Sequence, residues 1–154
     1  MSTKDDSGWG QLSGFESETG EEPPIRLVGP LHLRSAAVAC WNCARPTTVH
    51  ALIASDVVDM GEPGNAPCYV YGIHSPPRAL LDAIAPWASH FRLATYRTGA
   101  HLLANHCEHC DALQPDYKLH ADPDGPFHGE PPPGHFGPAV LDGDLQLDFA
   151  EYSY

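Results

Sequence analysis

The sequence predicts an α+β domain in which a small antiparallel sheet carries one amphipathic helix. Several short runs alternate apolar with polar side chains, which is the period of a half-buried strand. Residues 78–88 instead place their apolar side chains at helical spacing. Two C-x-x-C pairs, Cys40/Cys43 and Cys107/Cys110, lie at either end of this strand and helix region. Strands are expected to join the two pairs.

The cysteine pairs point to a bound metal. A C-x-x-C turn, here called a knuckle, directs two sulfurs to one side, and two knuckles complete the four-thiolate tetrahedron that structural zinc prefers. We therefore expect one structural Zn²⁺ held by Cys40, Cys43, Cys107 and Cys110. The α+β fold is then a zinc-ribbon-like two-knuckle core. Four sulfur ligands leave no open coordination position, so the ion would stabilise the fold without taking part in a reaction.

Disulfide bonds and a thioredoxin-type redox pair are the alternatives for these cysteines. Five cysteines and a start without a basic and apolar leader are more typical of a reducing compartment, so we expect a cytoplasmic protein and favour the metal. Pro46, shortly after Cys43, disfavours the long helix that follows a redox C-x-x-C pair. Cys68 lies among aromatic and β-branched residues and is expected to be buried.

The first part of the chain contains an arm and two strand regions. Residues 1–24 are rich in Ser, Gly and Glu and are expected to form a disordered acidic arm. The zinc-stabilised core domain is expected to span residues 25–120. Its first strand region, residues 25–40, is interrupted by Gly29-Pro30, which predicts two strands or one bent strand. The β-branched run at residues 47–53 predicts a strand that leaves the first knuckle.

The remaining elements begin with the predicted helix. Ser75 is expected to cap this helix, and its apolar face is expected to pack on the sheet. That face consists of Leu80, Leu81, Ile84, Trp87 and Ala88. Residues 91–96 and 101–105 are predicted strands that lead into the second knuckle. A Pro/Gly/His-rich linker at 121–138 and an acidic C-terminal strand at 139–154 complete the chain.

The formal net charge of −12 comes from the two ends of the chain. Residues 1–24 carry six carboxylates against Lys4, and residues 111–154 carry nine against Lys118, whereas residues 25–110 hold all six arginines and five carboxylates. Phosphate backbones repel such a chain, so no nucleic acid is expected as a partner. No apolar run is long enough for a membrane span, so no membrane contact is expected. A basic protein is the natural partner, although acidic ends can also serve solubility alone.

The residues around the knuckles also resemble a known group of proteins. They read C-W-N-C at 40–43, N-H-C-E-H-C-D-A-L-Q at 105–114 and Y-K-L-H at 117–120. Over residues 31–127 this pattern is similar to that of small bacterial zinc-ribbon-like proteins of unassigned function. The resemblance implies a zinc ion at the four cysteines and implies no activity. The chain departs from the pattern at Asp111, where those proteins carry Gly, but Asp tolerates the left-handed backbone of such a turn.

The histidine-rich segment 120–135 suggests an enzymatic alternative. A metal-dependent hydrolase would need a second, open metal site here. The available ligands are His120, Asp122, Asp124, His128, Glu130 and His135. Against this alternative, no H-E-x-x-H spacing places the ligands on one helix face, and the run of three prolines predicts irregular structure. We therefore expect no catalytic residue and a protein that is not an enzyme.

The expected function is a non-enzymatic protein-binding module. Acidic surface would engage a basic protein, as an immunity-type inhibitor engages a cationic toxin. The expected contact residues are the carboxylates of the C-terminal strand: Asp142, Asp144, Asp148 and Glu151. The first alternative is a structural or regulatory zinc protein whose acidic flanks only aid solubility. The second alternative is the metal-dependent hydrolase.

Overall fold

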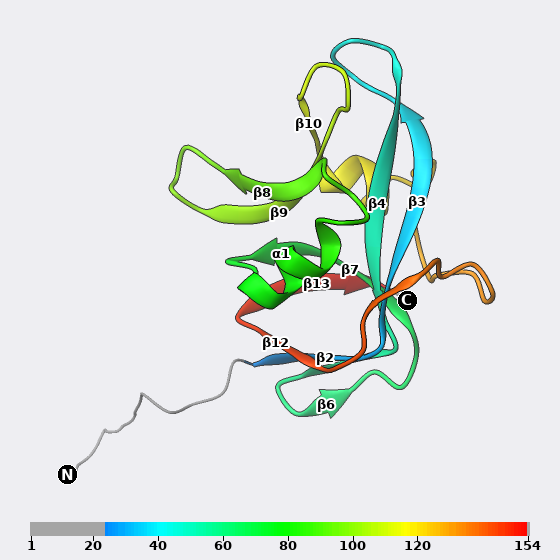
Figure 1. Cartoon of the computed structure of the whole chain (residues 1–154). Coiled ribbons are helices and arrows are strands. Elements are labelled where there is room, and N and C mark those ends of the chain that lie inside the picture. Colours follow the sequence, from blue (N-terminus) through cyan, green and yellow to red (C-terminus); the bar gives the residue numbers. More distant parts are fainter. Residues whose placement is uncertain (1–23, 154) are drawn as a thin grey trace.

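Two antiparallel β-sheets and one short α-helix make up the described part of the chain (Figure 1). The structure is a computed structural model that describes residues 24–153. The predicted acidic arm, residues 1–24, lies outside the described residues except for Pro24. Because the helix has only 7 residues, the fold is mostly β, and the expected α+β balance is corrected on this point.

The larger sheet has eight strands and curls into a half-barrel (Figure 1). Its order is β10-β9-β7-β4-β3-β11, with β13 paired to β7 and β8 paired to β9. The strands are β3 (Leu31–Ala39), β4 (Pro46–Ala54), β7 (Cys68–His74), β8 (Phe91–Thr95), β9 (His101–His106), β10 (Leu113–Gln114), β11 (Ala139–Leu141) and β13 (Phe149–Ser153). The small sheet predicted from the sequence is therefore a large one, because long-range pairings add strands that local patterns do not show.

A second sheet of four strands lies below the half-barrel in Figure 1. Its order is β12-β2-β5-β6. The strands are β2 (Ile25–Val28), β5 (Asp56–Asp59), β6 (Glu62–Pro63) and β12 (Leu145–Leu147). Gly29-Pro30 separates β2 from β3, which belongs to the other sheet. Of the two predicted alternatives for residues 25–40, two separate strands is the correct one.

The helix α1 (Arg78–Ile84) is shorter than the predicted 78–88. Ser75 does not cap it, because its backbone is left-handed (φ 49°) and its N–H donates to the carbonyl of His101. Pro77 is the N-cap instead, without a side-chain hydrogen bond. Trp87, expected on the buried face, is 55% exposed. No helix in residues 24–153 has the length and apolar character needed to cross a membrane.

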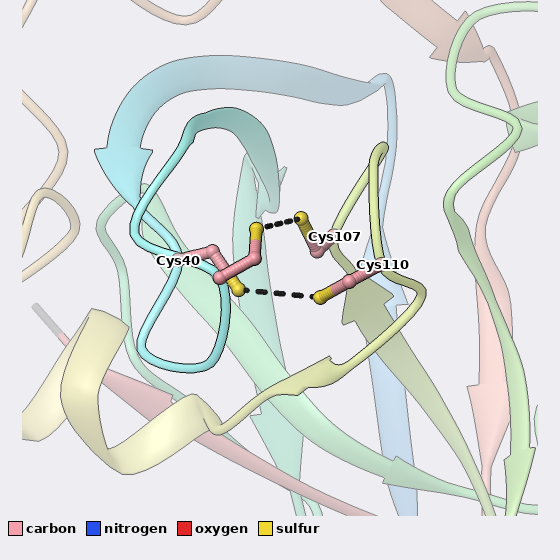
Figure 2. Close-up of side chains that lie close together, drawn as sticks. Cys40, Cys107 and Cys110 are labelled. Carbon is pink, nitrogen blue, oxygen red and sulfur yellow. Dashed lines mark hydrogen bonds between the residues drawn. The ribbon is translucent and has the colours of Figure 1, made fainter.

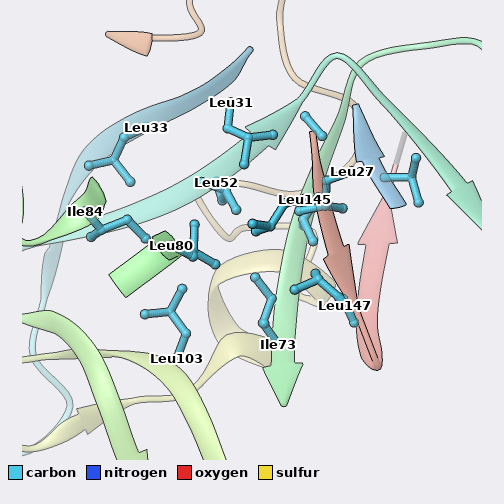
Figure 3. Close-up of a cluster of buried hydrophobic side chains, with 14 of the residues drawn as sticks. Leu27, Leu31, Leu33, Leu52, Ile73, Leu80, Ile84, Leu103, Leu145 and Leu147 are labelled. Atoms are coloured by element: carbon cyan, nitrogen blue, oxygen red, sulfur yellow. The ribbon is translucent and has the colours of Figure 1, made fainter. Parts of the chain in front are cut away.

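The main hydrophobic core lies between α1, the concave half-barrel and the small sheet (Figure 3). Leu80 and Ile84 of α1 point into it, so the predicted packing of the helix on the sheet is confirmed. Figure 3 labels these two with the strand residues Leu27, Leu31, Leu33, Leu52, Ile73, Leu103, Leu145 and Leu147. Each fully buried side chain of this size stabilises the fold by about 1.5–3 kcal/mol. Cys68 is also fully buried here, as expected.

A second, smaller core lies on the opposite face of β4. The side chains of β4 alternate, so Val49, Ala51 and Ile53 face this second cluster while Leu52 faces the first. A short π-helix, Tyr117–Ala121, and the chain after it cover this face. Phe127, within the predicted linker 121–138, is fully buried in the cluster. The cluster fixes the residues just after the second knuckle against the sheet.

Residues 139–153 form three strands where one acidic strand was predicted. β11 pairs with β3, β12 pairs with β2, and β13 pairs with β7. The segment therefore alternates between the two sheets. Leu145 and Leu147 enter the main core.

Candidate metal centre

The two knuckles face each other, and their four sulfurs form one cluster (Figure 2). All four Sγ atoms lie within 4.8 Å of one another. The Cys40–Cys110 and Cys43–Cys107 sulfur pairs are each 3.7 Å apart. A tetrahedral ion bonded to sulfur at about 2.3 Å, as Zn²⁺ is, requires sulfurs about 3.8 Å apart. A disulfide would need about 2.05 Å, so the geometry fits a metal and not the alternative of disulfide bonds.

The first knuckle closes the long hairpin between β3 and β4. The N–H of Ala44 donates to the Cys40 carbonyl at 2.9 Å, and the N–H of Cys40 donates to the Arg45 carbonyl at 2.9 Å. The N–H of Asn42 points at Cys40 Sγ, 3.3 Å away. Ala44 takes the left-handed conformation, with φ 65°. These bonds turn the chain tightly enough for both sulfurs to face the same side.

The second knuckle, between β9 and β10, repeats this pattern bond for bond. The N–H of Asp111 donates to the Cys107 carbonyl at 3.0 Å, and the N–H of Cys107 donates to the Ala112 carbonyl at 2.9 Å. The N–H of His109 points at Cys107 Sγ at 3.4 Å. Asp111 has φ 66°, which confirms that Asp takes the left-handed position here.

Glu108 joins the two knuckles. Its Oε2 accepts the Thr48 N–H at 2.6 Å, and its own N–H donates to Thr47 Oγ1 at 3.0 Å. The Trp41 indole N–H adds a second link by donating to the Leu113 carbonyl at 2.7 Å. These contacts hold the second knuckle against the start of β4, and the first knuckle against β10. Sequence reasoning missed them, although Glu108 stands between the two cysteines of its own knuckle.

Amide groups surround the sulfurs and favour negative charge on them. The Gln114 Nε2 donates to Cys40 Sγ at 3.3 Å, and the Asn42 Nδ2 donates to Cys110 Sγ at 3.5 Å. Burial raises the pKa of Cys40, but the N–H donors around it outweigh burial and lower the pKa to about 6. For Cys43, a backbone N–H lowers the pKa, but burial and the neighbouring sulfurs outweigh it and raise the pKa to about 11. A bound cation would balance the charge of four adjacent thiolates, so the clustered sulfurs form a candidate metal centre.

No family model, curated protein or solved structure matches this chain. The resemblance to small bacterial zinc-ribbon-like proteins is supported to the extent that the four cysteines of the pattern come together. Two other residues of the pattern, Asn105 and Gln114, have structural roles in this fold. The buried Asn105 joins β9 to β4 through the backbone of His50, and Gln114 contacts a sulfur.

The knuckle histidines do not belong to the sulfur cluster. His109 Nε2 lies 3.0 Å from the Pro46 carbonyl, and His106 Nδ1 lies 3.3 Å from the His90 carbonyl. Each ring is therefore engaged with backbone of another segment. Among the Cys, His, Asp and Glu side chains of residues 24–153, only the four cysteines form a group of three or more that could hold a metal ion.

The histidine-rich segment 120–135 does not converge into a second site within the described chain. His120 is buried and stacks on Tyr71, with ring centroids 4.1 Å apart. His128 Nδ1 lies 3.1 Å from the backbone carbonyl of His120. This contact involves the backbone of His120 and not its ring nitrogens. Burial lowers the pKa of His120 to about 4, so the ring is a neutral core residue at neutral pH.

The four carboxylates expected to contact a partner are all exposed, but they do not share one strand. Asp144 accepts bonds from the Arg26 guanidinium and the Gly29 N–H, each at 2.9 Å. Its charge is thus already used within the protein. Glu151 lies on β13 of the larger sheet, while Asp142 and Asp148 lie in the connections on either side of β12.

Proposed function

We propose that this protein is a non-enzymatic binding module with a zinc-ribbon-like core, held by one structural Zn²⁺ at Cys40, Cys43, Cys107 and Cys110. Its acidic surface engages a basic protein partner, in the manner of an immunity-type inhibitor of a toxin. The observation that carries the proposal is the closed set of four sulfurs, since an ion with four thiolate ligands has no position left for a substrate.

The charge distribution supports the second half of the proposal. The chain carries a net charge of −12, and four bound thiolates with one Zn²⁺ make it more negative still. Acidic complementarity accelerates encounter with a cationic partner and makes the rate depend on salt. Asp144 supports the alternative of a structural or regulatory zinc protein. Its charge stabilises the contact between β2 and the segment before β12 and is not left for a partner.

Metal content tests the first half. Native mass spectrometry of the full chain is expected to show one zinc per molecule. Alkylation is expected to modify four more cysteines after chelation than before it. Cys68→Ser is the matched control, because it removes a buried thiol outside the cluster and should leave the zinc in place. A chain without metal, or with two metal ions, would contradict the proposal.

Association kinetics test the second half. The products of the reading frames that neighbour this gene are the first basic proteins to try. The association rate is expected to fall steeply as ionic strength rises. A rate that does not change with salt, for a partner that does bind, would show that acidic surface does not drive recognition.

A further inference from the structure

A cleft lies in the larger sheet where the pairing partner of β7 changes from β4 to β9. β4 pairs with β7 as far as Val70, whereas β9 pairs with it at His74. Gly72 lies between these two pairings, and its N–H donates to Asp116 Oδ2 at 3.0 Å. β4 and β9 therefore leave a gap beside Gly72, and the cleft at this position has a volume of about 220 Å³.

Two carboxylates meet at Gly72. Asp116 comes from the residue before the π-helix, and Glu151 comes from β13, where it lies opposite Tyr71. A Cβ on Gly72 would lie 3.2 Å from Glu151 Oε2, so the missing side chain leaves room for this carboxylate. Within residues 24–153 neither carboxylate forms an ion pair. No cationic side chain of the described part of the chain thus compensates their negative charge.

Aromatic rings line the same cleft. Tyr96, Tyr117 and His74 contribute to its wall. Tyr96 and Tyr117 are 42% and 63% exposed and so lie at the mouth, while Leu103 and Gln114 are buried and so lie at the base. The faces of tyrosine rings attract cations, and carboxylates pair with them. This combination is suited to an organic cation.

The electrostatics of the cleft favour the binding of a cation. Burial, with a smaller effect of Glu151, raises the pKa of Asp116 to about 6, against the opposing effect of the Gly72 N–H. Burial and the charge of Asp116 raise the pKa of Tyr96 as well. A metal ion fits less well, because no group of three metal-binding side chains converges here in the described chain.

We propose that this cleft binds the side-chain ammonium of a lysine from the basic protein partner. The inference rests on the proposed function for the existence of that partner. A compact ammonium suits two carboxylates that meet at one point, whereas the planar fork of a guanidinium suits a single carboxylate held side-on. The apolar stem of lysine would lie along the leucine side chains of the cleft, Leu102, Leu103 and Leu113.

Nuclear magnetic resonance with a small probe tests this inference apart from any whole partner. Nα-acetyl-lysine methylamide is added to the zinc-bound full chain at pH 7.5, and the backbone amide of Gly72 is followed. Its shift is expected to move and saturate, because its N–H bonds to Asp116. Asp116→Asn is expected to weaken binding by about tenfold and Glu151→Gln by a few-fold. Asn keeps an acceptor for the Gly72 N–H, so the fold is expected to persist.

Three comparisons decide the outcome. The matched control Glu62→Gln removes an exposed carboxylate outside the cleft and should change binding by less than about twofold. The norleucine analogue, which lacks the ammonium, is expected to leave the Gly72 amide unmoved. Equal binding of norleucine, tighter binding of the arginine analogue, or binding unaffected by Asp116→Asn would each overturn the inference. A partner that binds with strong salt dependence in those cases would leave the proposed function in place and move its contact elsewhere.

Discussion

The four cysteines and the histidine-rich segment 120–135 are both rich in metal-binding side chains, yet only the cysteines converge. The cysteines lie in two turns with the same hydrogen bonds and nearly the same φ at Ala44 and Asp111. The segment 120–135 begins within the π-helix, and its buried histidine, His120, packs in the core instead of facing other ligands. A repeated spacing fixes the direction of side chains, whereas a high content of one residue type does not.

Among the variants that test this comparison, removal of a sulfur ligand should have the largest effect on metal content and stability. Cys40→Ser is expected to lose the metal and to lower the free energy of unfolding by about 3 kcal/mol or more. Urea denaturation and metal content by mass spectrometry measure both effects. His128→Ala and His135→Ala are the controls from the other region and should keep the same metal content as the wild-type protein. Loss of metal from either histidine variant would remove the distinction between the two regions.

Replacement of the buried histidine should give the next largest effect, and its sign depends on pH. Burial lowers the pKa of His120 to about 4, so the unfolded chain takes up a proton below about 6.5 that the folded chain refuses. The associated stability is present above pH 6.5 and is lost as pH falls towards 4. At pH 5, His120→Phe is expected to recover about 2 kcal/mol relative to wild type.

Denaturation curves of wild type and His120→Phe at pH 5 and pH 8 measure this difference. The exposed His135→Phe is the control and should leave the pH dependence unchanged. The comparison between variants also separates this effect from protonation of the thiolates, which is common to both proteins. If the stability of His120→Phe changes between pH 5 and pH 8 as much as that of the wild-type protein, the ring of His120 is not neutral in the core.

Loss of the link between the knuckles should have a smaller effect. Glu108→Ala removes the acceptor for the Thr48 N–H and is expected to cost about 1 kcal/mol. Glu108→Gln keeps an acceptor and should cost less. Thermal unfolding of the zinc-bound protein measures both, with the exposed Glu130→Ala as control. An equal effect of Glu108→Ala and Glu130→Ala would mean that the sulfurs alone set the distance between the knuckles.

Replacement of a left-handed residue in either knuckle by glycine should have the smallest effect on stability. Ala44 has φ 65°, a conformation that costs a residue with a Cβ about 1 kcal/mol relative to glycine. Ala44→Gly is expected to stabilise the protein by about 0.5–1 kcal/mol in urea denaturation. Asp111→Gly should gain less, because it also removes the hydrogen bond that Asp111 accepts from Arg92. A destabilised Ala44→Gly protein would contradict the view that the two turns are equivalent.

The local features of the site could be predicted from the sequence, and the long-range ones could not. Spacing alone identified the four cysteines, and the chemistry of Asp identified its left-handed turn. The role of Glu108 depends on Thr47 and Thr48, which lie sixty residues earlier in the chain. Such a contact becomes visible only when the register of β4 against its neighbours is known.

The fold shows the same limit. Apolar alternation and β-branched runs identified β2, β3, β4, β8 and β9, and helical spacing identified the buried face of the helix around Leu80 and Ile84. These patterns could not show that β13 joins β7, because this pairing brings together segments that lie far apart in the sequence. The cleft beside Gly72 depends on the same pairing, together with the exchange of β4 for β9. Its carboxylates, Asp116 and Glu151, therefore gave no joint signal in the sequence.

The pairing of the last strands with early ones has a consequence for biosynthesis. β12 completes the small sheet beside β2, and β13 covers an edge of β7 in the larger sheet. While the ribosome has yet to release residues 139–153, both sheets present open edges and the main core lacks Leu145 and Leu147. The two sheets and the main core can thus be completed only after residues 139–153 have been synthesised. Until then, the open strand edges are exposed to pairing with other chains.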